Sequence, residues 1–369
     1  MTQKNEYYKI GQLLNPLQRS ITTLYPQGSK CRIVVPARVD TFLCHHHYFV
    51  HPLRPQVYPV NSINFVLNQL TEAEVAIRSD KKIVITALET RKPLIEHVVK
   101  IMQQTLGFDT GFSVIAKNNH NTLHGGLGSS STLMTAVAQA INIIMGNHLT
   151  VQEMTKLLAQ NYGEETNKTG MLSTMASIGG ASASALSGKS LIIIGGEAEI
   201  WIKEDLPVGY EAVLRYPKNI KAISGIVDMQ LYKKGFELFE RIGYEWGDIK
   251  ENILRSKIIP AICKEDYSVL FKSINMYTIG AYGDIPQYFR SRWLSHNIFF
   301  DEFIYTIFLR LFAAVPMEEN CFFVSSGGPL LVIITNRFND VIAALGNITD
   351  NFSVDRVSLA RSGPQLEIE

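Results

Sequence analysis

A Gly/Ser-rich run directly before an apolar helical pattern is the segment of this chain best suited to chemistry. Its residues are His124, Gly125, Gly126, Leu127, Gly128, Ser129, Ser130 and Ser131. Glycines let backbone N–H groups come close to an anion, and the start of a helix adds unpaired N–H groups and partial positive charge. Serine hydroxyls add further donors. The run therefore predicts an anion site suited to phosphate or pyrophosphate.

A purely structural interpretation of the same run stays open. Gly126 and Gly128 would then shape a turn, and Ser129 would cap the helix. Three consecutive serines favour the anion site over that interpretation. The run is not a Walker A loop, because the chain has no G-x-x-x-x-G-K-[ST] pattern.

The helix that positions this loop is the best-defined element of the sequence. Apolar residues recur with the spacing of one helix face, over about four turns. They are Leu133, Ala136, Val137, Ala140, Ile141 and Ile144. Gly146 and Asn147 supply a stop signal. Thr150 and Glu153 then form a capping box, which predicts a second helix through about Tyr162.

The remaining segments alternate between strand-like and helix-like patterns. Strands are expected at 31–35, where Pro36 ends the run, and at 83–86, 112–115, 191–194, 199–202, 211–215, 322–324 and 330–335, with two more near the C-terminus. Helices are expected at 229–241, 250–263, 267–281, 301–312 and 339–345. A peripheral arm is expected at 1–30, an irregular His- and Pro-rich loop at 41–60, and a Gly/Ser/Ala-rich loop at 163–190.

This mixture predicts an α+β protein of about two domains, since domains commonly have roughly 100–200 residues. Asp205, Leu206 and Pro207 interrupt the pattern. The expected domains are therefore 1–205, which carries the Gly/Ser loop, and 206–369.

Charge and apolar content weigh against several classes of protein. Lys and Arg (35) nearly balance Asp and Glu (34), so no overall field would attract nucleic acid. No N-terminal segment resembles a signal peptide, and the apolar runs are far too short to span a bilayer. The four cysteines form no C-x-x-C pair. Buried free thiols in a reducing, cytoplasmic setting are expected.

The Gly/Ser run also carries a family resemblance. G-L-G-S-S-S followed by an Ala-rich helix resembles the second signature of the GHMP kinases, which include galactokinase and the homoserine, mevalonate and phosphomevalonate kinases. In that superfamily the loop wraps the phosphates of the donor. The resemblance implies a ribosomal-protein-like N-terminal domain joined to a ferredoxin-like C-terminal domain.

Four segments resemble one branch of the superfamily, the β-ribofuranosylaminobenzene 5′-phosphate synthases and related C-nucleoside synthases. They are His124 to Ser129, similar to H-x-G-L-G-S; Lys168-Thr169-Gly170 with paired glycines at 179–180 and 195–196, similar to [RK]-[ST]-G…G-G…G-G; Ser325-Ser326-Gly327-Gly328-Pro329, similar to S-S-W-G-P; and Arg32-Ile33 with Pro36-Ala37-Arg38, similar to R-I…P-x-R. The resemblance thus reaches along nearly the whole chain in short pieces.

The chain departs from this branch in several places. The departures are Gly327 for a tryptophan, Leu172 for a glycine, Ser177 and His45 for acidic residues, and Asp40 for a frequent His or Asn. They indicate an acceptor pocket that differs from that of the named synthase. No counterpart of the kinase catalytic Asp is evident, and Glu164 and Glu165 are the only carboxylates near its usual place. This favours chemistry without deprotonation of a hydroxyl.

The resemblance to this branch implies a decarboxylating C-ribosyl transfer. Phosphoribosyl pyrophosphate would be the donor, and a ring carbon of an aromatic or heteroaromatic carboxylate would attack its anomeric carbon. Pyrophosphate would leave, and loss of CO2 would restore aromaticity. Electrostatic stabilisation of the departing pyrophosphate, helped by Mg2+, would be the main term.

Each motif has a role under this interpretation. The Gly/Ser loop would hold a phosphate group, and His124 would contact either phosphate or the loop backbone. Arg38 and Lys168 would neutralise charge on the donor or acceptor. Asp40 or Glu165 would approach the metal or the ribose hydroxyls. The remaining substrate-binding candidates are Thr169, Gly170, and a second cradle facing the first, made of Ser325, Ser326, Gly327 and Gly328.

Two other functions stay open: an ATP-dependent small-molecule kinase, and a non-catalytic relative that senses a phosphorylated metabolite. His45, His46, His47 and His51 lack the spacing of a zinc site. We expect these histidines at the rim of the site. Phenylalanines between 299 and 312 recur near helical spacing, which predicts core or a subunit interface and, with it, a homodimer.

Overall fold

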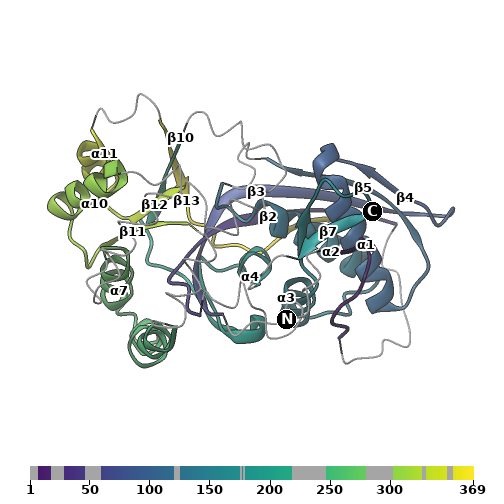
Figure 1. Cartoon of the computed structure of the whole chain (residues 1–369), viewed down its shortest axis with the longest axis horizontal. Helices are drawn as coiled ribbons and strands as arrows, with labels where there is room; N and C mark the ends of the chain where they lie inside the picture. The colour runs from purple at the N-terminus through teal and green to yellow at the C-terminus, as the bar shows by residue number, and fades with distance from the viewer. Residues whose placement is uncertain are drawn as a thin grey trace.

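The computed structural model describes residues 7–17, 29–45, 60–119, 125–174, 177, 179–217, 247–279, 302–325, 330–346 and 352–369. Within these residues the chain forms two lobes, each built on its own sheet, and the two lie side by side along the longest axis (Figure 1).

The first lobe is built on a sheet whose strands follow the order β14 (Gln365–Ile368), β2 (Lys30–Thr41), β3 (Ser62–Arg78), β5 (Gly111–Asn118) and β4 (Ile83–Thr86). The same sheet continues through β8 (Leu191–Ile194), which pairs with β3, and β9 (Ile200–Glu204), which pairs with β8. β4 runs parallel to β5, and the other pairs are antiparallel.

The helices of this lobe are α1 (Lys92–Leu106), which follows the 3-10 turn η2 (Glu89–Arg91), and then α2 (Ser129–Ile144), α3 (Val151–Gln160) and α4 (Gly180–Ser187). A small separate sheet has the order β1 (Tyr7–Lys9), β7 (Met171–Thr174) and β6 (Gly163–Glu165). A further 3-10 turn, η3 (Gly196–Ala198), joins β8 to β9.

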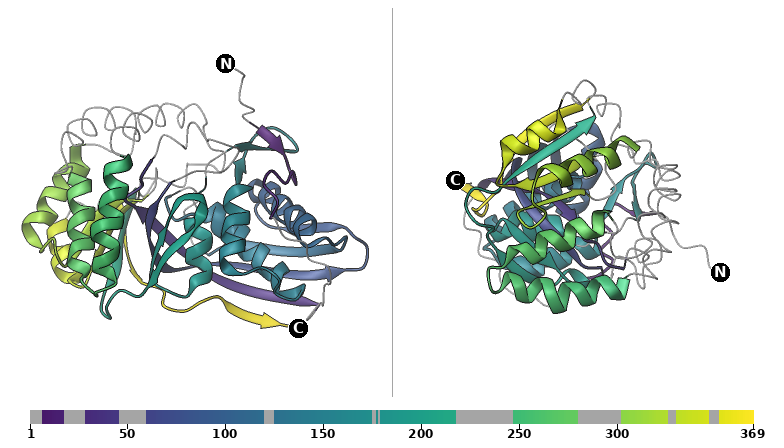
Figure 2. Two further views of the ribbon diagram at one scale, coloured as in Figure 1. Left: turned by 90° about the horizontal axis from the view of Figure 1, so that it is seen from below. Right: turned by 90° about the vertical axis from the view of Figure 1, so that its left-hand side faces the viewer.

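The second lobe is built on an antiparallel sheet with the order β11 (Asn320–Val324), β12 (Leu331–Thr335), β10 (Glu211–Pro217) and β13 (Phe352–Ser358). Its helices are a π-helical segment η5 (Leu254–Ile258), α6 (Ile259–Ile262), α7 (Tyr267–Ile279), α10 (Glu302–Ala314) and α11 (Phe338–Leu345). Figure 2 shows these helices at one end of the molecule, away from α1 and α2.

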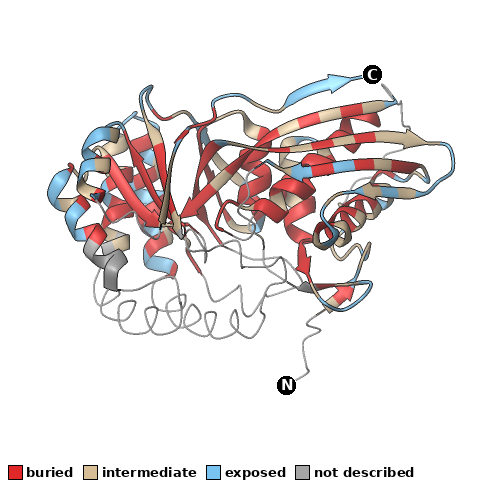
Figure 3. Ribbon diagram, turned by 90° about the horizontal axis from the view of Figure 1, so that it is seen from above, coloured by how far each residue is buried: buried red, intermediate tan, exposed pale blue. Residues whose placement is uncertain are grey.

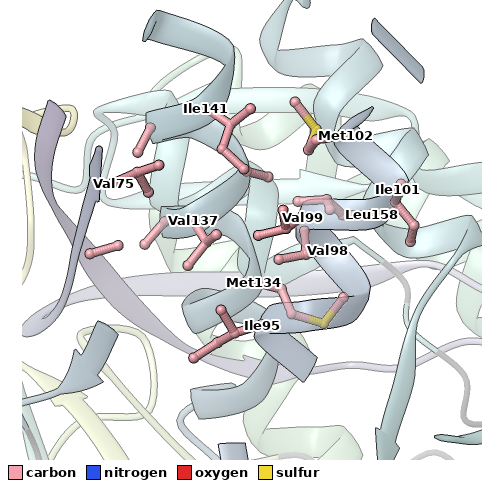
Figure 4. Packing of buried hydrophobic residues seen from close by; sticks show 14 of the residues in the cluster. Val75, Ile95, Val98, Val99, Ile101, Met102, Met134, Val137, Ile141 and Leu158 are labelled. Carbon is pink, nitrogen blue, oxygen red and sulfur yellow. The ribbon is translucent and has the colours of Figure 1, made fainter. Parts of the chain in front are cut away.

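The core of the first lobe forms where α1 and α2 pack on the sheet. Val98 and Val99 of α1 meet Val137 and Ile141 of α2, and Val75 of β3 lies beside them (Figure 4). All five are fully buried. Full burial of such side chains stabilises a fold by about 1.5–3 kcal/mol each, so this cluster fixes α2 firmly on the sheet.

A second core joins the two lobes. It contains Val39 of β2 and Phe65 of β3 together with Phe323 of β11 and Val332 of β12. The rings of Phe65 and Phe323 stack with centroids 5.7 Å apart. Figure 3 shows buried residues continuing from one lobe into the other along β2 and β3. The buried faces of these two strands therefore form the first lobe's part of the shared core.

One sequence expectation was wrong in this region, and two elements were not predicted. β2 does not end at Pro36 but continues to Thr41, because the register shifts between Pro36 and Ala37 and a proline is tolerated at such an irregularity. Strand β3 was not predicted, although its residues from Thr71 to Val75 alternate between buried and partly exposed positions, as is typical of a strand. Helix α1 was missed as well, although Pro93 marks its first turn.

The stretch 163–190 is not one loop, because it contains β6, β7 and α4. Small residues let α4 pack closely: Ala183 and Ala185 are fully buried in this short helix. Low side-chain volume, which suggested a loop, here serves close contact between a helix and the sheet.

Two local expectations about helices are confirmed. α2 spans the periodic segment, and Thr150 and Glu153 form the capping box that opens α3. The four cysteines are free, with Cys263 exposed and the others buried. No helix within the described ranges has the length and apolar character needed to cross a bilayer. The expected helix at 229–241 lies outside the described residues.

The α+β fold class is confirmed. The domain boundary near residue 205 stays a prediction; it falls between β9 of the first sheet and β10 of the second. The C-terminal strand β14 returns to pair with β2, so the last residues lie in the first lobe.

Candidate active site

The Gly/Ser loop lies at the start of α2, as expected. Gly128 takes the N-cap position with a left-handed φ of 67°, and no side chain caps the helix. The first intrahelical bond runs from the Thr132 N–H to the Gly128 carbonyl, 2.9 Å. The N–H groups of the first turn therefore have no acceptor within the helix, which is the arrangement that binds anions.

Arg38, Asp40 and Ser325 meet the loop from two other elements. Arg38 and Asp40 lie near the end of β2, and Arg38 Nη1 is 3.0 Å from Asp40 Oδ1 and 3.4 Å from the Gly126 carbonyl. Ser325 follows β11; its hydroxyl donates to the Gly126 carbonyl at 2.6 Å and lies 3.3 Å from Asp40 Oδ1. The Asp40 N–H donates to the Ser325 hydroxyl at 3.1 Å. The junction thus brings three sequence motifs to one place.

The geometry of the loop favours glycine at Gly126 and at Gly128. Gly126 has a φ of 99°, and a Cβ there would lie 2.9 Å from the backbone oxygen of Ser325. At Gly128 a Cβ would lie 3.3 Å from the Arg38 guanidinium carbon. The two turns therefore face each other closely, and Arg38 lies against the loop, where it adds positive charge beside the N-terminus of α2.

A second arginine lies beneath the loop. Arg91, at the start of α1 and 2% exposed, donates to the Ser130 hydroxyl at 2.5 Å and to the Ser129 hydroxyl at 3.0 Å. Its Nη1 also donates to Glu165 Oε1 of β6 at 2.6 Å. Burial, and then neighbouring Glu164, raise the pKa of Glu165, and Arg91 opposes this rise. Arg91 is thus the cation that favours a carboxylate in this buried place.

The described residues near the loop do not fit a protein-held Mg2+. Asp40 is engaged by Arg38 and Ser325, and Glu165 by Arg91. No cluster of three or more His, Cys, Asp or Glu that could hold a metal occurs among the described residues. A divalent ion ligated by Glu165 and Ser130 would have to displace the Arg91 guanidinium.

The Lys168 segment lies apart from the Arg38 cluster. Lys168, Thr169 and Gly170 are exposed in the turn between β6 and β7. The Lys168 ammonium lies 3.5 Å from the centre of the Tyr7 ring, and the Gly170 carbonyl accepts from the Ile10 N–H at 3.0 Å. These contacts hold the segment at β1, so the structure does not bring Lys168 together with Arg38.

Several candidate residues lie outside the described residues: His124, Ser326, Gly327, Gly328, His46, His47 and His51. Gly125 and Leu127 are buried beside the junction, and Ser131 is partly exposed in the first turn of α2. His45 lies 2.7 Å from Glu251, which pairs it with a carboxylate of the second lobe.

Arg91 is the residue of this site that the sequence did not reveal. The only signal is a helix start, since Pro93 directly follows Arg91 and Lys92 and proline favours the first helical turn. That signal locates α1 but does not say that Arg91 turns inward, because this depends on the distant partners Ser130 and Glu165.

Comparisons with known proteins agree with this architecture. Residues 93–181 match the family model described as GHMP kinases N terminal domain, which covers α1, the loop and α2. The chain has the GHMP fold. No curated protein matches its sequence at a significant level.

Three solved structures illustrate the likeness. Homoserine kinase from Cytophaga hutchinsonii is 13% identical, with a TM-score of 0.57 and coverage of 94% of this chain and 100% of that chain. Mevalonate diphosphate decarboxylase from Staphylococcus aureus is 14% identical, with a TM-score of 0.60 and coverage of 92% and 98%. Galactokinase from Lactococcus lactis, complexed with galactose, is 11% identical, with a TM-score of 0.60 and coverage of 91% and 95%. At such low sequence identity, the structural similarity shows the GHMP fold alone.

Proposed function

We propose that this chain is a small-molecule kinase that transfers the terminal phosphoryl group of ATP to a hydroxyl acceptor. The observation that carries the proposal is the start of α2, which no side chain caps, with Arg38 against Gly128, on a GHMP fold. Two of the similar structures named above are kinases, and this favours phosphoryl transfer over the ribosyl transfer that the short motifs imply.

Catalysis of phosphoryl transfer depends mainly on positioning of the donor and acceptor and on positive charge around the transferred group. The first-turn N–H groups of α2 and the Arg38 guanidinium supply both on the donor side. Asp40 is the carboxylate next to Arg38, 3.0 Å away, at the junction of the lobes. We propose that Asp40 orients the acceptor hydroxyl, a role for which its carboxylate must lie within hydrogen-bond distance of that hydroxyl.

A second candidate is the decarboxylating C-ribosyl transfer from phosphoribosyl pyrophosphate. It is favoured by one observation: two of the described carboxylates at the loop are already engaged by arginines, Asp40 by Arg38 and Glu165 by Arg91. Such a site suits a reaction in which no hydroxyl has to be deprotonated. Mg2+ would then come with the donor's pyrophosphate.

The two candidates differ in the donor, so a thermal-shift comparison of ATP and phosphoribosyl pyrophosphate, each with Mg2+, separates them. A ligand at 100 times its Kd stabilises a fold by about 2.7 kcal/mol. Stabilisation by ATP, followed by phosphate transfer to a panel of small alcohols, is the expected result.

The other results are equally informative. Stabilisation by phosphoribosyl pyrophosphate alone, with release of pyrophosphate and CO2 from carboxylated azoles or benzoates, would replace the kinase with the C-ribosyltransferase. Binding of either donor without turnover across both acceptor panels would leave a non-catalytic binding protein for phosphorylated metabolites. The expected cytoplasmic location and homodimer belong to this proposal and do not depend on which donor binds.

A further inference from the structure

Arg91 has a contact pattern that the proposed function does not use. Its side chain is 2% exposed, yet a single guanidinium contacts three residues of two elements: Ser129 and Ser130 in the first turn of α2, and Glu165 in β6. Burying an arginine is costly unless its charge is paired and its donors are used. Because it contacts two serines of the Gly/Ser loop, Arg91 can affect the loop itself as well as join α2 to β6.

The guanidinium fixes the direction in which Ser130 can donate. A serine hydroxyl has one proton and two acceptor lone pairs. An arginine carries only donors, so Ser130 Oγ must accept from Arg91 Nη1 at 2.5 Å. The Ser130 proton therefore remains for a different acceptor. Contact with a cation also makes this hydroxyl a stronger donor toward an anion.

Arg91 also occupies a place that would otherwise suit a metal ion. Its Nη1 lies between a hydroxyl oxygen and a carboxylate oxygen, 2.5 Å from Ser130 Oγ and 2.6 Å from Glu165 Oε1. Hydroxyl and carboxylate oxygens are the ligands that Mg2+ prefers. A guanidinium is always charged at physiological pH, so this position holds a permanent cation.

We propose that Arg91 is the positioning residue of the phosphate loop: it fixes Ser130 as a hydrogen-bond donor to the bound phosphate and replaces a divalent cation between Ser130 and Glu165. The inference rests on the proposed function only in taking the loop as a phosphate site. It holds for either donor, because both present phosphates to α2.

A double-mutant cycle with inorganic pyrophosphate as the probe tests the coupling. Calorimetry would give Kd for the wild type, Ser130→Ala, Arg91→Met and the double variant. Ser130→Ala should weaken pyrophosphate binding about tenfold in the wild-type background, the size of one hydrogen bond to a charged group. In the Arg91→Met background the same change should weaken binding less than about twofold, because the hydroxyl is then no longer held. Equal losses in the two backgrounds would overturn the proposal, as would a wild type that does not bind pyrophosphate.

Two further variants complete this test, one as a control and one as an alternative substitution at Arg91. Thr132→Val removes a hydroxyl of the same turn whose proton goes to the Gly128 carbonyl at 2.8 Å, so it should leave Kd unchanged. Arg91→Lys serves where Arg91→Met fails to fold. It keeps the charge but not the planar fork, and should reduce the loss from Ser130→Ala in the same direction.

Mn2+ binding without phosphate, followed by electron paramagnetic resonance, tests the cation's place. The wild type and Glu165→Gln should give the same titration. A Mn2+ site in the wild type that Glu165→Gln abolishes would overturn the assignment of this place to Arg91. Failure of the kinase proposal gives a different result. If the effects of Ser130→Ala and Arg91→Met on pyrophosphate binding are coupled but no phosphoryl transfer occurs, the kinase function is wrong and the role of Arg91 stands. If phosphoryl transfer occurs but the two effects are independent, the role of Arg91 is wrong and the kinase function stands.

Discussion

Asp40 shows how one side chain at this junction can serve the acceptor rather than the donor. It is 3% exposed, and Arg38 and Ser325 hold its carboxylate at one edge. A carboxylate repels the phosphates of a donor and accepts a hydrogen bond from a hydroxyl. Its place beside Arg38 therefore fits orientation of an acceptor, with Arg38 offsetting its charge.

Asp40→Asn should separate donor binding from turnover. Removing the negative charge should leave the donor Kd unchanged or tighter, whereas kcat should fall by about 10²–10⁴, the usual contribution of a positioned acid or base. Ser325→Ala is the control, since it removes a contact to Asp40 and keeps the charge. Unchanged kcat in Asp40→Asn, with Kd measured by calorimetry, would contradict an acceptor role.

Gly126 offers a second test at the scale of one residue. Gly126→Ala combines a φ of 99° with a Cβ 2.9 Å from the Ser325 backbone oxygen. Gly107→Ala has a φ of 71° and nothing within 4 Å, so it measures the cost of the backbone conformation alone. We expect about 1 kcal/mol of destabilisation for Gly107→Ala and at least about 1 kcal/mol more for Gly126→Ala, by urea unfolding.

Donor affinity should distinguish the same two variants. Gly126→Ala pushes the two turns apart and should weaken donor binding, while Gly107→Ala, at the C-cap of α1, should not. Equal losses of stability and equal donor affinity in the two variants would mean that the close approach at Gly126 does not shape the site.

At the scale of elements, His97 of α1 fastens the N-terminal segment to the first lobe. It is fully buried, Nδ1 accepts from the Gly11 N–H at 2.8 Å, and Nε2 lies 2.8 Å from the Asn161 carbonyl. The carbonyl can only accept, so Nε2 carries the proton and the ring is neutral. Burial is the main reason that the pKa of His97 falls from 6.5 to about 4.

This lowered pKa predicts a loss of stability in mild acid. Between pH 6.5 and about 4 the unfolded chain binds a proton at His97 that the folded chain does not, so stability is present above pH 6.5 and decreases as pH falls through this window. The full loss in the free energy of unfolding across this window is about 3 kcal/mol. The difference in unfolding free energy between the wild type and His97→Gln, measured at pH 7 and pH 4.5, should therefore shrink toward acid. A difference independent of pH would show that His97 titrates normally.

Element by element, the sequence allowed prediction where a pattern was local. The periodicity of α2 and the Thr150–Glu153 box depend on neighbours in the chain, and both predictions are confirmed. β2 was cut short at Pro36 because its irregularity depends on β3, a partner that the sequence does not name. α4 was missed because burial of small residues is decided by the sheet against which it packs.

The same distinction applies to the candidate site. The loop could be found because Gly and Ser have local reasons to precede a helix. The cradle of Ser325 to Gly328 facing the loop stays a prediction, of which the structure describes Ser325, whose hydroxyl donates to the Gly126 carbonyl. Arg91 could not be found, since its partners lie 39 and 74 residues away.

At the scale of the molecule, the site lies where the lobes share a core. Phe323 and Phe322 are neighbours on β11 with opposite faces: Phe323 packs on Phe65 at the junction, and Phe322 packs on Phe312 in the outer core of the second lobe. Both are almost fully buried. Truncating either ring should lower the free energy of unfolding by about 3–5 kcal/mol.

The two truncations should nevertheless differ in donor binding. Phe323→Ala empties the junction two residues before Ser325, so the contact between Ser325 and Gly126 loosens and donor affinity falls. Phe322→Ala leaves a cavity of similar size on the far face of the same strand, and affinity at a temperature where both variants are folded should stay near that of the wild type. Hydrogen exchange should then show lower protection of β2 and β3 in Phe323→Ala, because their core extends through the junction, and little change there in Phe322→Ala. If both variants keep full donor affinity, the lobes are held together by contacts other than this shared core.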